Sequence, residues 1–175
     1  MYLFNILTNY GAFSVLDKKK DWGGYKGDLD LSEKLMVAIV KASEAYKKDA
    51  DSIFRNYGLT FSKYNVLRIL SNSPGGKNTI SITSRIMLVS GANMTGIAKR
   101  LEKDGFIIRR SDTSDERVTL LEITPKGRQA IKNISAEKDE LIMTHLKGFS
   151  EDEKMRILED IKRIFNRGNA FTRRG

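Results

Sequence analysis

A helix, a tight turn and a second helix in the middle of the chain constrain its fold more than any other feature. Apolar residues at helical spacing predict a short helix from Thr79 to about Leu88. Ser90 is placed to cap a second helix, which runs to Asp104 and stops at Gly105. The core face of that helix has the i, i+3, i+4, i+7 spacing and consists of Met94, Ile97, Ala98 and Leu101. This arrangement is typical of a helix-turn-helix.

A β-hairpin is predicted directly after this motif. Two β-prone runs, residues 106–110 and 118–123, are joined by the charged segment 111–117, which we expect to protrude as a wing. Thr124 and Pro125 then open another helix, because Pro is favoured at the first helical position. We therefore predict a mainly α fold with a small β-hairpin wing, in which a winged helix-turn-helix (59–124) is flanked by long helices.

Capping signals delimit the flanking helices. Asp30 and Glu33 form a capping box at the start of a helix within 31–58, and Gly58 is placed to end it. Ser150 and Glu153 form another capping box, which opens the last of the helices expected within 125–168. Residues 1–30 are expected to be an N-terminal arm and linker without the basic start of a secretory signal, and 169–175 a tail.

Composition limits the chemistry that the chain can perform. It has no cysteine and one histidine, His145, which excludes thiol catalysis, iron–sulfur clusters and the common zinc sites. We find no nucleophile–base set and no phosphate loop, so we expect neither an enzyme nor a bound metal or cofactor. The formal net charge is +9, and residues 77–132 hold eleven Lys and Arg against six Asp and Glu, which is +5 of that excess. Such a local surplus favours a polyanionic partner.

The face of the second helix opposite its core residues has the chemistry of a DNA-reading surface. Asn93 and Thr95 can bond base edges, and Lys99 and Arg100 can hold phosphates or guanines. Glycine inside a helix costs about 1 kcal/mol relative to alanine, so glycine here favours close approach of the backbone to bases. The predicted DNA-binding residues of this helix are Ser90, Gly91, Ala92, Asn93, Thr95, Gly96, Lys99 and Arg100. The alternative is a solvated face without a DNA role.

Four segments, in this order and at these spacings, resemble the MarR family of bacterial transcriptional regulators. They are residues 93–96 (Asn-Met-Thr-Gly), 100–107 (Arg-Leu-Glu-Lys-Asp-Gly-Phe-Ile), 115–117 (Asp-Glu-Arg) and 123–127 (Ile-Thr-Pro-Lys-Gly). The resemblance implies that Arg117 on the wing enters the minor groove, with Asp115 orienting its guanidinium. A narrow minor groove concentrates negative potential and attracts arginine. The alternative is an Asp–Arg pair that only stiffens the turn.

The resemblance also implies a homodimer, joined by dimerisation helices within 31–58 and 125–168, that binds a pseudo-palindromic operator and is released by a small aromatic or lipophilic effector. Tyr46, Phe54, Tyr57 and Tyr64 are candidates to line the effector site; the alternative is that they belong to the core. We predict a cytoplasmic, sequence-specific repressor whose partners are double-stranded DNA and a second copy of itself, and not a membrane. The alternative is a winged-helix module that binds proteins without specific DNA binding.

Overall fold

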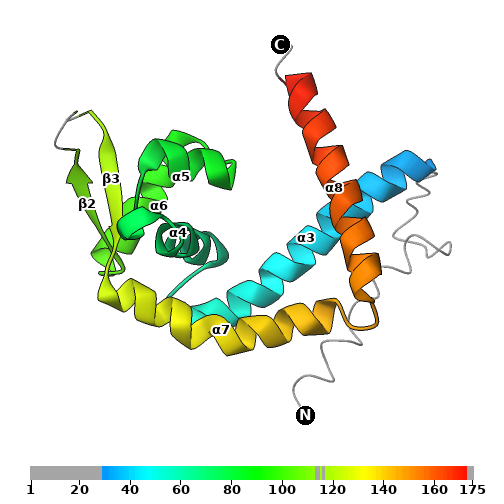
Figure 1. Cartoon of the computed structure of the whole chain (residues 1–175), viewed down its shortest axis with the longest axis horizontal. Helices are drawn as coiled ribbons and strands as arrows, with labels where there is room; N and C mark the ends of the chain where they lie inside the picture. Colours follow the sequence, from blue (N-terminus) through cyan, green and yellow to red (C-terminus); the bar gives the residue numbers. More distant parts are fainter. Residues whose placement is uncertain (1–28, 113–114, 116, 173–175) are drawn as a thin grey trace, which may run out of the picture. The chain divides into compact units, whose positions relative to one another are not determined.

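The computed structural model describes residues 29–112, 115 and 117–172, and it divides into two compact units, one ending at Lys48 and one starting at Asp49 (Figure 1). In the first unit the structure describes the start of helix α3 (Leu31–Arg55). The predicted capping box is present there, because Asp30 and Glu33 exchange backbone-to-side-chain hydrogen bonds of 3.1 and 2.8 Å. Helix α3 ends three residues before Gly58, and the predicted arm up to residue 28 lies outside the described residues.

The second unit is mainly helical with a small sheet, which confirms the predicted fold class. Its elements, in chain order after the end of α3, are α4 (Phe61–Ser71), the short 3-10 helix η1 (Pro74–Gly76), β1 (Lys77–Thr79), α5 (Ile80–Met87), α6 (Gly91–Lys103), β2 (Ile107–Ser111), β3 (Thr119–Ile123), α7 (Pro125–His145) and α8 (Glu151–Thr172). Among the described helices, none is long and apolar enough to cross a membrane.

Local side-chain caps explain where the helices begin. The hydroxyls of Thr60, Ser90 and Thr124 each accept a hydrogen bond from a backbone N–H of the following helix, at 3.1 to 3.3 Å. Such a cap satisfies a donor that has no partner inside the helix. The capping box at Ser150 and Glu153 is also confirmed, with hydrogen bonds of 2.7 to 3.3 Å.

The sheet has three strands, so the prediction of a simple two-stranded hairpin was incomplete. Strand β3 lies in the centre, antiparallel to β2 on one side and to β1 on the other. Strand β1 pairs Lys77 with Glu122 and Thr79 with Leu120. Three residues of mixed polarity carry no readable alternation, so only the pairing with β3 defines this strand.

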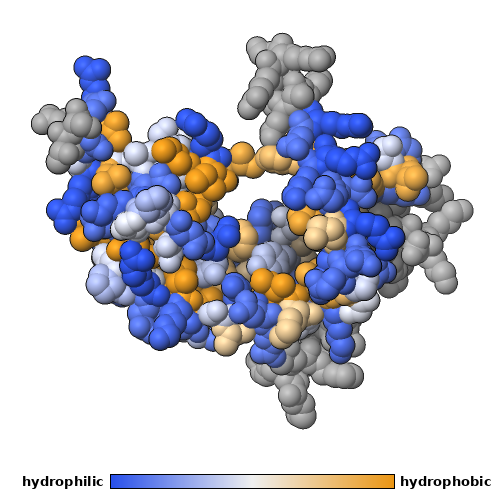
Figure 2. Space-filling model, viewed as in Figure 1, coloured by the Kyte–Doolittle hydropathy of each residue, from blue (hydrophilic) through white to orange (hydrophobic). Residues whose placement is uncertain are grey.

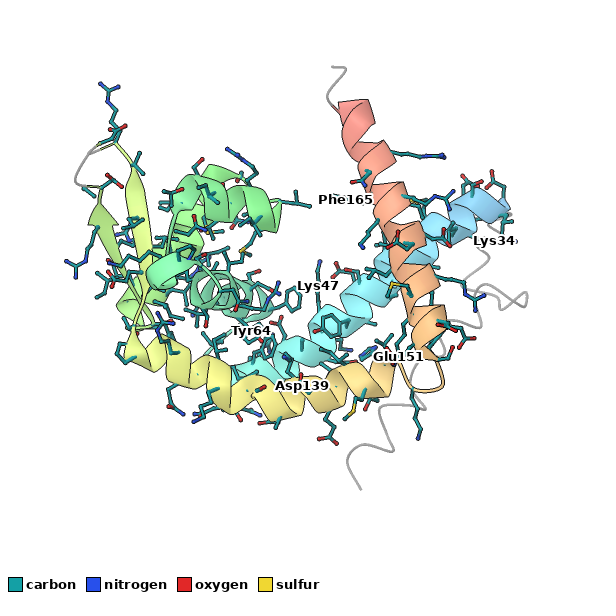
Figure 3. The ribbon with its side chains drawn as sticks, in the orientation of Figure 1. Lys34, Lys47, Tyr64, Asp139, Glu151 and Phe165 are labelled. Atoms are coloured by element: carbon teal, nitrogen blue, oxygen red, sulfur yellow. The ribbon has the colours of Figure 1, made fainter. Side chains whose placement is uncertain are left out.

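One hydrophobic core joins the sheet to the end of α3 and to helices α4 to α7. The four residues predicted for the core face of α6 are all buried, as are Ile107 of β2 and Leu121 of β3. Phe54 stacks on Tyr64 with ring centroids 4.2 Å apart (Tyr64 is labelled in Figure 3). Gly127 closes the base of the wing, because a Cβ there would lie 2.5 Å from the Phe106 carbonyl oxygen. Helix α6 and the wing are thus built on one packed support.

Candidate nucleic-acid interface

The first turn of α6 presents its side chains to solvent. Its core face is buried, and Gly91, Ala92 and Asn93 are exposed on the opposite side together with Lys99 and Arg100. The side-chain amide of Asn93 has no hydrogen-bond partner among the described residues. An exposed amide of this kind can bond adenine in the major groove through both its donor and its acceptor.

Two predicted DNA-binding residues of α6 also serve the helix itself. The Ser90 hydroxyl accepts a hydrogen bond from the Asn93 N–H at 3.2 Å and thereby caps the helix. The Thr95 hydroxyl donates to the Gly91 carbonyl oxygen at 2.9 Å, and Thr95 is half-buried. Ser90 and Thr95 therefore shape the first turn of α6, whereas Asn93 offers its side chain outward.

The two glycines of α6 are not required by packing inside the protein. A Cβ at Gly91 would meet no described atom within 4 Å, and one at Gly96 would meet only the Arg100 guanidinium, at 3.8 and 4.0 Å. Gly96 nevertheless costs the helix about 1 kcal/mol relative to alanine. Its absence of a side chain leaves the helix backbone open to close approach from outside.

Acidic side chains of this domain are paired with cations. Glu102 pairs with Arg109 at 2.7 Å, and Asp104 pairs with Lys63 at 2.7 Å. The Glu122 carboxylate forms ion pairs with two cations of the sheet, with Lys77 at 3.4 Å and with Arg110 at 3.6 Å. These ion pairs offset the charge of three of the six acidic residues in 77–132.

The cations around α6 and the wing tip are left without such partners. Among the described residues of α5, α6 and the wing tip, five exposed basic side chains form no ion pair: Arg85, Lys99, Arg100, Lys103 and Arg117. They come from α5, α6 and the wing. Part of the surplus charge that the sequence places in residues 77–132 is therefore displayed on these three elements, and Arg128 and Lys132 of α7 display another part.

The wing tip is held by backbone hydrogen bonds. The Val118 N–H donates to the Asp115 carbonyl oxygen at 2.9 Å, and the Asp112 N–H donates to the Val118 carbonyl oxygen at 2.9 Å. The Asp115 carboxylate accepts a hydrogen bond from the backbone N–H of Arg117 at 3.0 Å. Asp115 thus fixes the backbone of the turn; among the described contacts, it does not bond the Arg117 guanidinium as the resemblance implied.

Helix α5 exposes apolar side chains beside this charged surface, a feature that the sequence analysis did not identify. Ile82, Ile86 and Leu88 have exposed fractions of 43%, 55% and 68%. Figure 2 shows apolar side chains gathered over this helix. Leu88 ends α5 with a left-handed backbone, at φ +54°. We call these three residues the α5 apolar patch.

The four aromatic residues considered for an effector site lie in different environments. Phe54 and Tyr64 are core residues, which agrees with the alternative reading of them. Tyr57 is half-buried and donates a hydrogen bond to the Glu137 carboxylate on α7; that hydrogen bond, with burial and the charge of Glu137, raises the pKa of Tyr57. Tyr46 lies on α3 in the first unit and is half-buried.

The acidic side chains and His145 were also compared for their spacing. No group of three or more His, Asp or Glu side chains lies close enough to hold a metal ion among them. His145 lies 3.1 Å from the Asp49 carboxylate, as part of a link between α7 and α3.

Comparisons with known proteins agree with this geometry. A model of the MarR family matches residues 59–119, from two residues before α4 to the first residue of β3. The transcriptional regulator MhqR of Bacillus subtilis is 30% identical over 141 residues, which cover 77% of this chain and 93% of MhqR.

Solved structures share the fold. Sco3205 of Streptomyces coelicolor, a MarR family regulator in complex with DNA, has a TM-score of 0.71 at 20% identity, over 80% of this chain and 89% of that chain. BpsR of Bordetella bronchiseptica, whose DNA binding is regulated by 6-hydroxynicotinic acid, has a TM-score of 0.69 at 18% identity, over 79% and 97%. The winged helix, the sequence motifs and the relatives together show that the chain belongs to the MarR family of transcriptional regulators.

Proposed function

We propose that the protein is a homodimeric, sequence-specific DNA-binding regulator in which α6 reads base edges and the wing holds the flanking groove. The exposed face of α6 carries this proposal: its Asn93 amide has no hydrogen-bond partner among the described residues, its glycines meet no close packing contact there, and the cations beside them form no ion pair with a described residue. Base-edge contacts of this kind specify sequence, and the cations hold phosphates. Arg117 enters the adjacent minor groove in this arrangement.

Exposed apolar faces on the outer helices support the homodimer. The exposed apolar residues of α3 are Leu31, Leu35, Met36 and Val40, and those of α8 are Met155, Ile157, Leu158, Ile161 and Phe165 (Phe165 is labelled in Figure 3). Exposed apolar surface of this kind on a helix marks an interaction site. A second copy would cover the apolar face of each helix and place two recognition helices in successive major grooves, about 10 bp apart on a pseudo-palindrome.

Regulation by a small aromatic or lipophilic effector is the second part of the proposal. It is supported by BpsR, whose DNA binding responds to 6-hydroxynicotinic acid. We further propose that the dimer acts as a repressor, because a protein seated across two major grooves of a promoter excludes polymerase from that DNA.

A winged-helix module that binds a protein partner is the second candidate function. The α5 apolar patch favours it, since apolar side chains on the surface are typical of protein interfaces. The two functions differ in their response to salt. Binding through phosphates weakens steeply as salt rises, whereas an apolar interface is far less sensitive.

The test is fluorescence anisotropy with a labelled duplex from the region upstream of the protein's own coding sequence, beside a scrambled duplex, between about 50 and 200 mM salt. Specific regulation predicts tight binding to the upstream duplex and a steep fall with salt. Arg117→Ala should weaken binding to both duplexes and lower the salt slope by about 1, whereas Arg156→Ala on α8 serves as the matched control and should change neither. Equal, weak and salt-insensitive binding by the parent would support the protein-interaction module.

A further inference from the structure

We propose that Glu102 is a positioning residue, which couples the recognition helix to the wing so that both meet DNA as one body. The inference rests on the proposed function, because it concerns how the two DNA-contacting elements are held relative to each other. Glu102 itself is not expected to touch DNA. It acts through Arg109 of β2.

Two hydrogen bonds join Glu102 in the last turn of α6 to a single residue of the wing. One carboxylate oxygen, Oε1, accepts from the backbone N–H of Arg109 at 3.1 Å. The other, Oε2, accepts from the Arg109 Nε at 2.7 Å. Two bonds to one residue fix both the distance and the orientation between helix and strand.

The first of these bonds covers the free edge of the wing. Strand β2 lies at the edge of the sheet, in the order β1-β3-β2, so one side of its backbone has no strand partner. The Arg109 N–H is on that side, and it donates to Glu102. The recognition helix thus takes the place that a fourth strand would occupy at this position.

The Glu102 carboxylate is held in its charged form. The hydrogen bond from the Arg109 side chain, with that from its backbone and the charge of Arg109, keeps the pKa of Glu102 below its usual range. Both side chains are partly exposed, at 36% for Glu102 and 27% for Arg109. A partly exposed ion pair adds little stability. The main effect of this pair is therefore to fix the position of β2 relative to α6.

The chain provides a matched control at Glu122. Its carboxylate is also partly exposed, at 27%, and also pairs with cations, Lys77 and Arg110. Those partners lie on β1 and β2, so its ion pairs stay within the sheet and do not reach α6. Removal of Glu122 should therefore disturb the charge of the wing without uncoupling it from the recognition helix.

A double-mutant cycle between Glu102 and the wing tip tests the inference. DNA affinity is measured by fluorescence anisotropy on the upstream duplex for the parent, Glu102→Ala, Arg117→Ala and the double variant, and the same set is made with Glu122→Ala. If Glu102 positions the wing, the fold-loss caused by Arg117→Ala shrinks by about threefold or more in the Glu102→Ala background. It stays unchanged in the Glu122→Ala background.

Hydrogen exchange gives a readout without DNA. The amide of Arg109 should exchange faster in Glu102→Ala, while the amides of α6 keep their protection, which shows that the variant is folded. Glu102→Gln is the second variant, because its side-chain oxygen can still accept from the Arg109 backbone; it should retain part of the protection and of the coupling to Arg117.

An Arg117→Ala fold-loss that is equal in the parent and in both Glu102 variants would overturn the inference. The same holds if the Arg109 amide keeps its protection in Glu102→Ala. If Arg117→Ala costs nothing even in the parent, the proposed DNA-binding surface itself is wrong. The cycle therefore separates the failure of the inference from the failure of the proposed function.

Discussion

Helices α6 and α8 have similar apolar patterns, but among the described residues only α6 buries its apolar face. Met94 and Leu101 of α6 are fully buried, whereas none of the α8 residues whose side chains the structure describes, 151–168, is buried. Leu158 and Ile161 keep exposed fractions of 48% and 45%. The periodicity of a helix indicates which face is apolar, but it does not indicate whether that face packs within the chain or against another molecule.

The largest effect on stability is expected from a substitution in the buried core face of α6. Leu101→Ala should lower the free energy of unfolding by about 2–5 kcal/mol, because it removes a fully buried side chain and leaves a cavity. The control is Leu158→Ala on α8, which should cost much less at a protein concentration low enough to keep the chain monomeric. Urea denaturation followed by circular dichroism measures both. Equal losses would mean that α8 is packed within the monomer after all.

The next effect concerns the partner of α8. Ile161→Glu places a charge in the exposed apolar face, so we expect it to prevent dimerisation, as measured by sedimentation velocity. Loss of the second linked half-site should then weaken operator binding by roughly 100-fold. Asn166→Glu, which adds the same charge at an exposed polar position of α8, is the control and should leave the dimer intact. A dimeric Ile161→Glu protein would place the interface elsewhere.

A smaller effect is expected from a substitution on the exposed face of α6, where stability and DNA binding should change in opposite directions. Gly96→Ala should stabilise the protein by up to about 1 kcal/mol, because the new Cβ meets only the Arg100 guanidinium at ordinary contact distance. It should at the same time weaken DNA binding. Gly168→Ala on α8 is the matched control, since a Cβ there would meet no described atom within 4 Å; it should stabilise the helix and leave DNA affinity unchanged. Unchanged affinity in Gly96→Ala would remove the glycine from the interface.

The smallest effect is the response of the two helices to acid. Hydrogen bonds from Arg109 lower the pKa of Glu102 in α6, and hydrogen bonds from Ser150 lower the pKa of Glu153 in α8. A lowered folded-state pKa gives stability that is present above the usual glutamate pKa of about 4.3 and is lost as the pH falls through the folded value.

Carboxyl chemical shifts followed by NMR between neutral pH and strongly acidic pH test this response. Both glutamates should titrate below the usual value. Ser150→Ala should move the midpoint of Glu153 upward and leave that of Glu102 in place. A midpoint for Glu153 that does not move would show that the capping box is not the cause of its lowered pKa.

Most of the fold could be predicted from the sequence because its signals are local. The hydroxyl caps at Ser90 and Thr124 and the core face of α6 each depend on residues within a few positions of one another. Strand β1 could not be predicted in this way, since only its pairing with β3 makes it a strand. The same holds for the bond from Glu102 to Arg109, because its geometry depends on how β2 lies against α6.

The exposure of the main candidate residues could be predicted from the sequence, but their hydrogen bonds could not. Asn93, Lys99 and Arg100 are exposed on α6 as expected. The contact of Asp115 with the Arg117 backbone differs from the expected contact with the guanidinium, because a short turn brings the carboxylate to the N–H two residues on. The α5 apolar patch was missed, since Ile82 and Ile86 have the spacing of core residues.

The unpaired cations of α5, α6 and the wing have a consequence for the kinetics of binding. Arg85, Lys99, Arg100, Lys103 and Arg117 form no ion pair among the described residues, so none of them has to leave a carboxylate before it can meet a phosphate. The encounter with DNA is then free of an internal rearrangement, and long-range attraction sets its rate. We expect the association rate constant itself to fall steeply as ionic strength rises.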